Sequence, residues 1–185
     1  MKFKNQAKEI HQDIFLIESF LDQEILNKYQ TQLNAFKEED WYAHGNIEPN
    51  DNVIDFWNGR GSPDIIDADL HDPILNLVAP DYWIYHHTNF VRVKAQEVAP
   101  TQVNNEYFIN NTPIIADYKV SWYLGDFEGG AIIFPKLPFI YQPKANDLLI
   151  WKIDPEYVHK SSVVTSGTKF AYTDLLIYHK GYFIA

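Results

Sequence analysis

The sequence predicts one mainly β domain, a sandwich or barrel of short strands with a helical flank at its N-terminus. A chain of 185 residues is long enough for one compact core, and 46% of its residues are hydrophobic and 16% aromatic. From Trp83 onward, runs rich in Val, Ile, Tyr and Phe alternate with Asn, Gly, Pro and Asp. Many short strands at this spacing are typical of sandwiches and barrels.

Residues 1–80 are expected to form an α/β flank. Residues 14–18 predict a strand, and a helix is predicted to open at Asp22, which can cap its first turn. The apolar residues that follow recur at helical spacing and predict one buried stripe: Ile25, Leu26, Tyr29, Leu33 and Phe36. Residues 38–70 predict loop with short strands near 53–57, and Asp72-Pro73 predicts a short helix.

Residues 81–185 are expected to form the β core of the same single domain, which spans 1–185. The predicted strands are 83–86, 90–94, 114–124, 131–134, 139–142, 147–153, 162–165 and 169–178. Alternation along the last strand puts Lys169, Ala171 and Thr173 on one face.

The composition argues against several classes of function. The formal charge is −10, and lysine and arginine are scattered, so we expect no nucleic-acid partner. The chain has no cysteine, which excludes disulfides, thiolate metal sites and a cysteine nucleophile. No stretch resembles a signal peptide or a membrane span, so we expect a cytoplasmic protein with no membrane partner. The oligomeric state stays open.

The most informative segment begins at Tyr123 and ends near the C-terminus. In order it contains Tyr123-Leu124-Gly125, Gly129-Gly130, Phe134-Pro135, Pro143-Lys144-Ala145-Asn146-Asp147, His159 and Gly167-Thr168-Lys169. This unbroken order is more specific than any single short motif. It resembles the prolyl 4-hydroxylase-like iron(II)/2-oxoglutarate-dependent oxygenases.

The resemblance implies that the core is a double-stranded β-helix, or jelly roll. It also implies that His159 is an iron(II) ligand and that Lys169 binds the distal carboxylate of 2-oxoglutarate. Tyr123 is expected to give that carboxylate a hydrogen bond, and Thr173 to share the cosubstrate site. The imidazole and the ammonium are expected to converge in one closed cavity. The implied activity is a dioxygenase that hydroxylates a protein side chain or a small molecule.

The first metal-binding motif of that family, His-x-Asp or His-x-Glu, is degenerate here. One intervening residue would keep both ligands on one strand face, yet residues 91–125 contain no histidine. The best counterpart is Asn104-x-Glu106, with Gln102-x-Asn104 as the other register. Glu106 offers a carboxylate, whereas Asn104 offers an amide oxygen, a weaker ligand for iron(II) than imidazole. His86 and His87 are alternative ligands, because strand alternation points one of them inward.

Three functions from different classes are compatible with these residues. The first is the iron(II)/2-oxoglutarate-dependent dioxygenase. The second is a catalytically inactive protein of the same fold, which holds a dicarboxylate through Lys169 without a metal. The third is an unrelated jelly roll, such as a carbohydrate-binding or viral structural domain, in which motifs like Gly129-Gly130 are turn residues that need positive φ angles.

Overall fold

The computed structural model describes residues 7–43, 60–61, 73–74, 82–95, 106–109 and 112–178. For residues 42–43, 60–61, 82–89, 106–109, 112–115 and 177–178 it describes the backbone alone. Within these residues the protein is mainly β with one N-terminal α-helix, as the sequence predicts. No helix in the described ranges is long and apolar enough to span a membrane.

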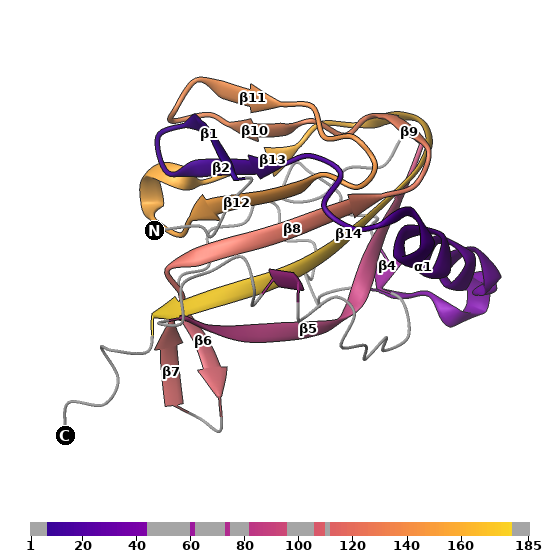
Figure 1. Cartoon of the computed structure of the whole chain (residues 1–185), viewed down its shortest axis with the longest axis horizontal. Helices are drawn as coiled ribbons and strands as arrows, with labels where there is room; N and C mark the ends of the chain where they lie inside the picture. Colours follow the sequence, from indigo (N-terminus) through magenta and orange to yellow (C-terminus); the bar gives the residue numbers. More distant parts are fainter. Residues whose placement is uncertain are drawn as a thin grey trace, which may run out of the picture.

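A large antiparallel sheet, here called the major sheet, unites both ends of the described chain (Figure 1). Its strand order is β1 (Lys8–His11), β2 (Ile14–Ile17), β12 (Leu148–Lys152), β8 (Tyr118–Leu124), β14 (Val164–Tyr178), β5 (Tyr82–Lys94), β4 (Arg60–Gly61) and β3 (Tyr42–Ala43). Strand β9 (Phe127–Gly129) pairs with β14 off this path. The N-terminal strand β2 therefore lies beside β12, far along the chain.

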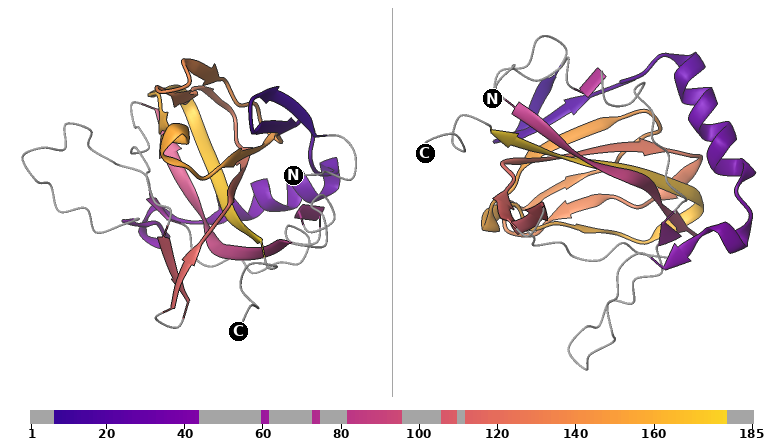
Figure 2. Two further views of the ribbon diagram at one scale, coloured as in Figure 1. Left: turned by 90° about the vertical axis from the view of Figure 1, so that its left-hand side faces the viewer. Right: turned by 90° about the horizontal axis from the view of Figure 1, so that it is seen from below.

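A smaller sheet, the minor sheet, lies above β12 in Figure 1. It consists of β11 (Phe139–Tyr141), β10 (Ile132–Phe134) and β13 (Lys160–Ser161). A separate hairpin of β6 (Glu106–Ile109) and β7 (Thr112–Ile115) projects below β5, away from the minor sheet, in Figure 1 and in the left view of Figure 2. Two short 3-10 helices, η1 (Glu38–Asp40) and η2 (Pro155–Tyr157), complete the described elements.

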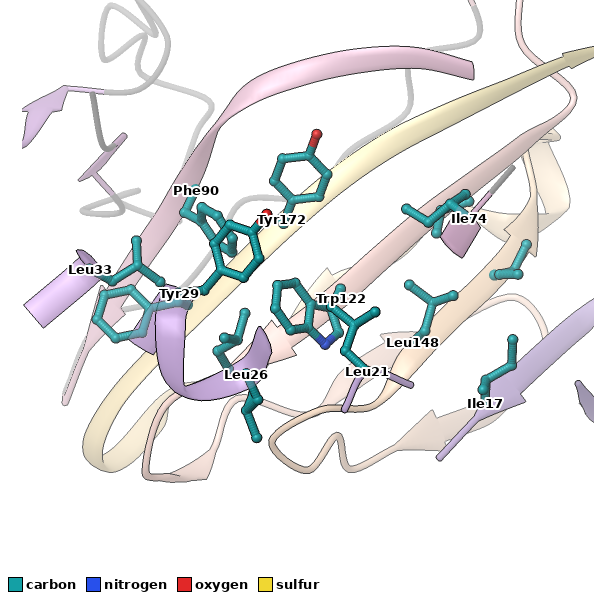
Figure 3. Close-up of a cluster of buried hydrophobic side chains, with 14 of the residues drawn as sticks. Ile17, Leu21, Leu26, Tyr29, Leu33, Ile74, Phe90, Trp122, Leu148 and Tyr172 are labelled. Carbon is teal, nitrogen blue, oxygen red and sulfur yellow. The ribbon is translucent and has the colours of Figure 1, made fainter. Parts of the chain in front are cut away.

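Helix α1 (Gln23–Ala35) packs its predicted stripe against one face of the major sheet, here called the outer face. Leu26, Tyr29 and Leu33 are buried there. Tyr29 meets Trp122 edge-on at 5.5 Å between ring centroids, within the apolar cluster of Figure 3. Asp22 occupies the N-cap position, but its side chain makes no cap hydrogen bond, so burial of this stripe and not the cap anchors the helix.

The structure merges strands that the sequence separates. The predicted strands 83–86 and 90–94 are parts of one strand, β5, and residues 162–165 and 169–178 fall largely within β14. Tyr172 pairs with Phe90 and Asp174 pairs with His86, so residues 87–89 of β5 lie opposite Thr173 alone. This bulge lets β5 run on as one strand. The predicted strands near 53–57 lie outside the described residues.

The turn before β12 joins the two ends of the fold. Asn146 has a positive φ of 69° and is buried. Its side-chain oxygen accepts from Leu21 N at 3.0 Å and Trp122 Nε1 at 3.1 Å, and its amide donates to Leu21 O at 2.7 Å. Asp147 accepts from Tyr141 Oη at 2.6 Å. The Pro143 to Asp147 motif is thus a structural turn that fixes β12 against β8.

A second core lies between the major and minor sheets, on what we call the inner face. Its buried members are Ile14, Leu16, Tyr123, Ile132, Phe134, Leu149, Trp151 and Tyr157. They come from β2, β8, β10, β12 and η2. Neighbouring residues on a strand point to opposite faces. Strand β8 therefore packs Trp122 against α1 on the outer face and turns Tyr123 to the inner face.

Candidate functional site between the two sheets

The paired strands β8 and β14 carry an unusual polar series on the inner face. Tyr123 lies opposite Ala171, Ser121 opposite Thr173 and Lys119 opposite Leu175. Lys169 precedes Ala171 by two residues and therefore belongs to the same series. Lysine and serine are uncommon in a fully packed interior. This polar series is therefore the candidate binding site.

Lys169 is buried, with 3% of its surface exposed. Its Nζ donates to Gly130 O, and Ser161 Oγ lies 3.4 Å away. The ammonium also sits over the Tyr123 ring, 4.8 Å from its centroid, which is a cation–π distance. Burial lowers the pKa of Lys169 from 10.5 to about 7. Among the described residues no carboxylate pairs with this ammonium, so it is a cation held by neutral groups.

Gly130 makes room for this lysine. Its φ is +63°, and a Cβ built there would lie 3.0 Å from Lys169 Cδ and 3.3 Å from Lys169 Nζ. Both the backbone conformation and the close approach of the lysine favour glycine. The sequence indicates a turn at Gly129-Gly130, and the structure adds that the second glycine accommodates the Lys169 side chain.

His159 is partly buried against two aromatic rings, immediately before β13. Its ring lies 4.8 Å from Trp151 and 5.7 Å from Phe134, measured between centroids. Its Nδ1 lies 3.2 Å from Tyr157 O, a contact that needs the proton on Nδ1 and leaves the lone pair on Nε2. Burial, assisted by the charge of Lys119, lowers the pKa of His159 from 6.5 to about 3. The imidazole is therefore neutral at pH 7.

The structure places His159 and Lys169 against the same core, the one between the major and minor sheets. Ser161, which contacts the ammonium of Lys169, follows His159 by two residues at β13, so alternation puts both on one face. His159 packs on Trp151 and Phe134 of the inner core, and Lys169 lies over Tyr123 of the same core. A single closed cavity between the two groups stays a prediction.

Two hydroxyl groups lie in the middle of the polar series. Ser121 Oγ and Thr173 Oγ1 are 3.2 Å apart across the β8–β14 pair. Tyr123 is buried, with 2% of its surface exposed, and burial raises the pKa of its phenol, which stays neutral. Tyr123, Thr173 and Lys169, all expected to bind the cosubstrate, therefore share one face of one strand pair.

Lys119 is a buried residue on the same face that the sequence analysis missed. It is buried, with 9% of its surface exposed, and its Nζ lies 5.7 Å from the centroid of the Trp151 ring. Burial lowers the pKa of Lys119 from 10.5 to about 7. The sequence did contain a signal for Lys119. Tyr123 was expected to face the site, and strand alternation turns Ser121 and Lys119 to the same face as Tyr123.

No protein-family model and no curated protein matches this sequence, but solved structures match its coordinates. A viral collagen prolyl hydroxylase from Paramecium Bursaria Chlorella virus-1, in complex with 2-oxoglutarate, is 16% identical with a TM-score of 0.61, over 89% of this chain and 95% of that one. A prolyl hydroxylase from Trichoplax adhaerens, in complex with a hypoxia inducible factor peptide, is 15% identical with a TM-score of 0.65, over 93% and 86%. A 2-oxoglutarate–iron(II) oxygenase family member from Burkholderia pseudomallei is 11% identical with a TM-score of 0.61, over 92% and 88%. The chain has the fold of the iron(II)/2-oxoglutarate oxygenases.

This oxygenase fold confirms the resemblance inferred from the motif order, because the match spans most of the chain. At these identities the similarity establishes the fold. The roles expected for Lys169, Tyr123, Thr173 and His159 stay predictions, supported by the placement of all four on the inner side of the major sheet.

The other ligands expected in an oxygenase fold lie where side chains are not described. The backbone of Glu106 belongs to the projecting β6–β7 hairpin, where it pairs with Ile115. His86 and His87 belong to β5, with His86 paired to Asp174. Asn104 and Gln102 lie outside the described residues, so these assignments also stay predictions.

The described residues alone do not complete the ligand set of a bound iron(II). Three protein ligands are the usual minimum for this metal in oxygenases. No group of three or more His, Cys, Asp or Glu residues that could hold a metal ion occurs among the described residues. His159 packs against the Trp151 ring, and the ammonium of Lys119 lies over the same ring, where its positive charge disfavours a divalent cation.

Proposed function

We propose that this protein binds 2-oxoglutarate or a closely similar dicarboxylate on the inner face, with Lys169 receiving the distal carboxylate. We also propose that its core is a jelly roll within a single domain, as the oxygenase fold implies. The observation that supports the binding function is the ammonium of Lys169, which is 3% exposed and lacks a carboxylate partner among the described residues. A buried cation of this kind is stabilised when an anion joins it.

The neighbours of Lys169 suit such a ligand. The Ser121–Thr173 hydroxyl pair and the Tyr123 phenol supply neutral hydrogen-bonding groups on the same strand pair. The ligand would replace contacts that Lys169 now makes with a backbone carbonyl and a serine hydroxyl. A charge-assisted bond to a carboxylate is about twice as strong as a bond between neutral groups.

A second candidate function is the iron(II)/2-oxoglutarate-dependent hydroxylation of a protein side chain or small molecule. One observation favours it: His159 is neutral, with its lone pair on Nε2, which is the form that ligates metals. Bound iron would supply the activation of dioxygen. This function requires that side chains outside the described set, Glu106 among them, complete the ligands. Cytoplasmic location and a small-molecule or protein partner belong to the same proposal.

Isothermal titration calorimetry with 2-oxoglutarate tests the proposed binding. Wild-type protein in EDTA should bind, and Lys169→Met should weaken binding roughly 100-fold or more, as expected when one partner of a buried charged pair is lost. Lys136→Met, which removes an exposed lysine on the β10–β11 turn, is the matched control and should bind like the wild type. Equal affinity of the Lys169→Met and wild-type proteins would refute the assignment.

A separate assay tests the second candidate. Purified protein is incubated with iron(II), ascorbate and 2-oxoglutarate, and succinate is measured by mass spectrometry. Succinate formed by the wild type and lost in His159→Ala would support the dioxygenase. Binding of 2-oxoglutarate without succinate formation would leave the binding protein as the function.

A further inference from the structure

The hydroxyl of Ser161, beside the Lys169 ammonium, is held by two long contacts. Ser161 Oγ donates to Gly130 O at 3.3 Å and lies 3.4 Å from Lys169 Nζ. Both distances exceed the usual limits, which are about 3.0 Å for a hydroxyl donor and about 3.2 Å for an N–H donor. The Ser161 hydroxyl is therefore weakly bonded next to a buried cation, and a stronger acceptor would draw it away from Gly130.

The ammonium itself has room for one more partner. An ammonium carries three N–H donors. Within the described part of the chain, its hydrogen bonds go to Gly130 O and Ser161 Oγ. The rings of Tyr123 and Phe127 also contact it, with centroids 4.8 Å and 5.8 Å from Lys169 Nζ. These rings stabilise the charge through their π electrons, so one N–H donor is left for a ligand.

Solvent reaches the inner face beside these two groups. Lys169 is 3% exposed, whereas Ser161 is partly exposed. Ala171 and Thr173, which follow Lys169 on the inner side of β14, are also partly exposed, although Tyr172 between them is buried. A ligand that approaches Lys169 from this side would meet the Ser161 hydroxyl as well as the ammonium.

We propose that Ser161 is a second donor to the distal carboxylate of the ligand. One carboxylate oxygen accepts from Lys169 Nζ and the other from Ser161 Oγ, while Gly130 O keeps its bond from the lysine. This inference rests on the proposed function, which assigns the distal carboxylate to Lys169. A hydrogen bond to a carboxylate is stronger than the neutral bond that it replaces. Ser161 thus makes the site specific for ligands with a carboxylate at this end.

A pair of variants with nearly the same shape tests the hydroxyl directly. Ser161→Thr keeps the hydroxyl, and Ser161→Val replaces it with a methyl group. In calorimetry with EDTA, the valine variant should bind 2-oxoglutarate roughly 10- to 100-fold more weakly than the threonine variant, as expected for the loss of a hydrogen bond to a charged group. 2-Oxopentanoate, which lacks the distal carboxylate, should not distinguish the two variants.

The neighbouring serine is the matched control. Ser162 Oγ accepts a hydrogen bond from Ala131 N at 2.9 Å, so Ser162→Ala also removes a hydroxyl contact between β10 and the end of β13. This variant should bind 2-oxoglutarate like the wild type. Thermal melts without ligand establish that each variant is folded before its affinity is compared.

The outcomes separate this inference from the proposed function. If Lys169→Met loses affinity but Ser161→Thr and Ser161→Val bind equally, Ser161 is not a donor and only this inference fails. A loss in Ser162→Ala as large as that in Ser161→Val would also overturn it, because the loss would then come from a loosened strand. If the wild type does not bind 2-oxoglutarate, the proposed function itself fails.

Discussion

The two faces of the major sheet differ sharply although the same strands build both. On the outer face, β8 and β14 contribute Trp122 and Tyr172 to an apolar cluster with α1. On the inner face, the alternate residues of the same strands include Lys119, Ser121 and Lys169. We propose that the outer face mainly supplies stability, and that the inner face, beside its own apolar core, carries the binding site. The four predictions below test that division, from the largest expected effect to the smallest.

The outer face should be the more sensitive to truncation. Trp122 is fully buried and contacts Tyr29 and Phe90, so Trp122→Ala should lower the free energy of unfolding by about 3–5 kcal/mol. Urea denaturation followed by far-UV circular dichroism measures this. Ile140→Ala removes a side chain that is 65% exposed and should change stability little. Equal effects of the two variants would contradict the assignment of the core.

The Asn146 turn should be the next most sensitive position. Asn146→Ala removes three side-chain hydrogen bonds and leaves the polar groups of Leu21 and Trp122 unpaired, so a loss of about 2–3 kcal/mol is expected. Asn146→Gly loses the same bonds but tolerates the positive φ of 69°, and it should be more stable than the alanine variant by about 1 kcal/mol. Urea titration of both variants separates the stability lost with the hydrogen bonds from the stability lost through backbone strain at the positive φ. Identical losses in the two variants would exclude a contribution from backbone strain.

A methyl group at Gly130 should disturb the inner face by displacing Lys169. Gly130→Ala should cost about 1–2 kcal/mol for the left-handed backbone alone and should also weaken 2-oxoglutarate binding. The coupling is tested by adding Lys169→Met. If the new methyl group acts through the lysine, the stability losses of the two single variants will not add in the double variant. Strict additivity would show that the glycine is needed for the backbone conformation alone.

The smallest expected effect is a pH dependence. The pKa of Lys119 and of Lys169 is lowered from 10.5 to about 7, so above pH 7 the unfolded chain binds more protons than the folded protein. Stability should therefore rise with pH from about 7 toward 10.5, by about 1 kcal/mol per lysine between pH 6 and pH 8. Urea titrations of wild type and Lys169→Met at both pH values measure the difference. A wild-type rise no larger than that of the variant would contradict the burial of this charge.

Several of these features could be predicted from the sequence. The period of Leu26, Tyr29 and Leu33 identified the buried stripe of α1, because helical spacing depends on local residues alone. The ordered motifs through Lys169 indicated the fold that the solved structures share.

Other features could not be predicted, most of them because they depend on contacts between residues far apart in the sequence. Lys119 was overlooked because lysines are usually exposed, although alternation from Tyr123 turns it inward. The role of Asn146 depends on Leu21, 125 residues away in sequence, which no local pattern reveals. The fit of Gly130 against Lys169 likewise depends on contact between β9–β10 and β14.

A crystal structure of the protein grown in EDTA with 2-oxoglutarate tests the central claim most directly. We expect ligand density on the inner face, with the distal carboxylate about 2.7–2.9 Å from Lys169 Nζ. Density elsewhere on the protein, or an ammonium of Lys169 still bonded to Gly130 O beside an unbound site, would contradict it.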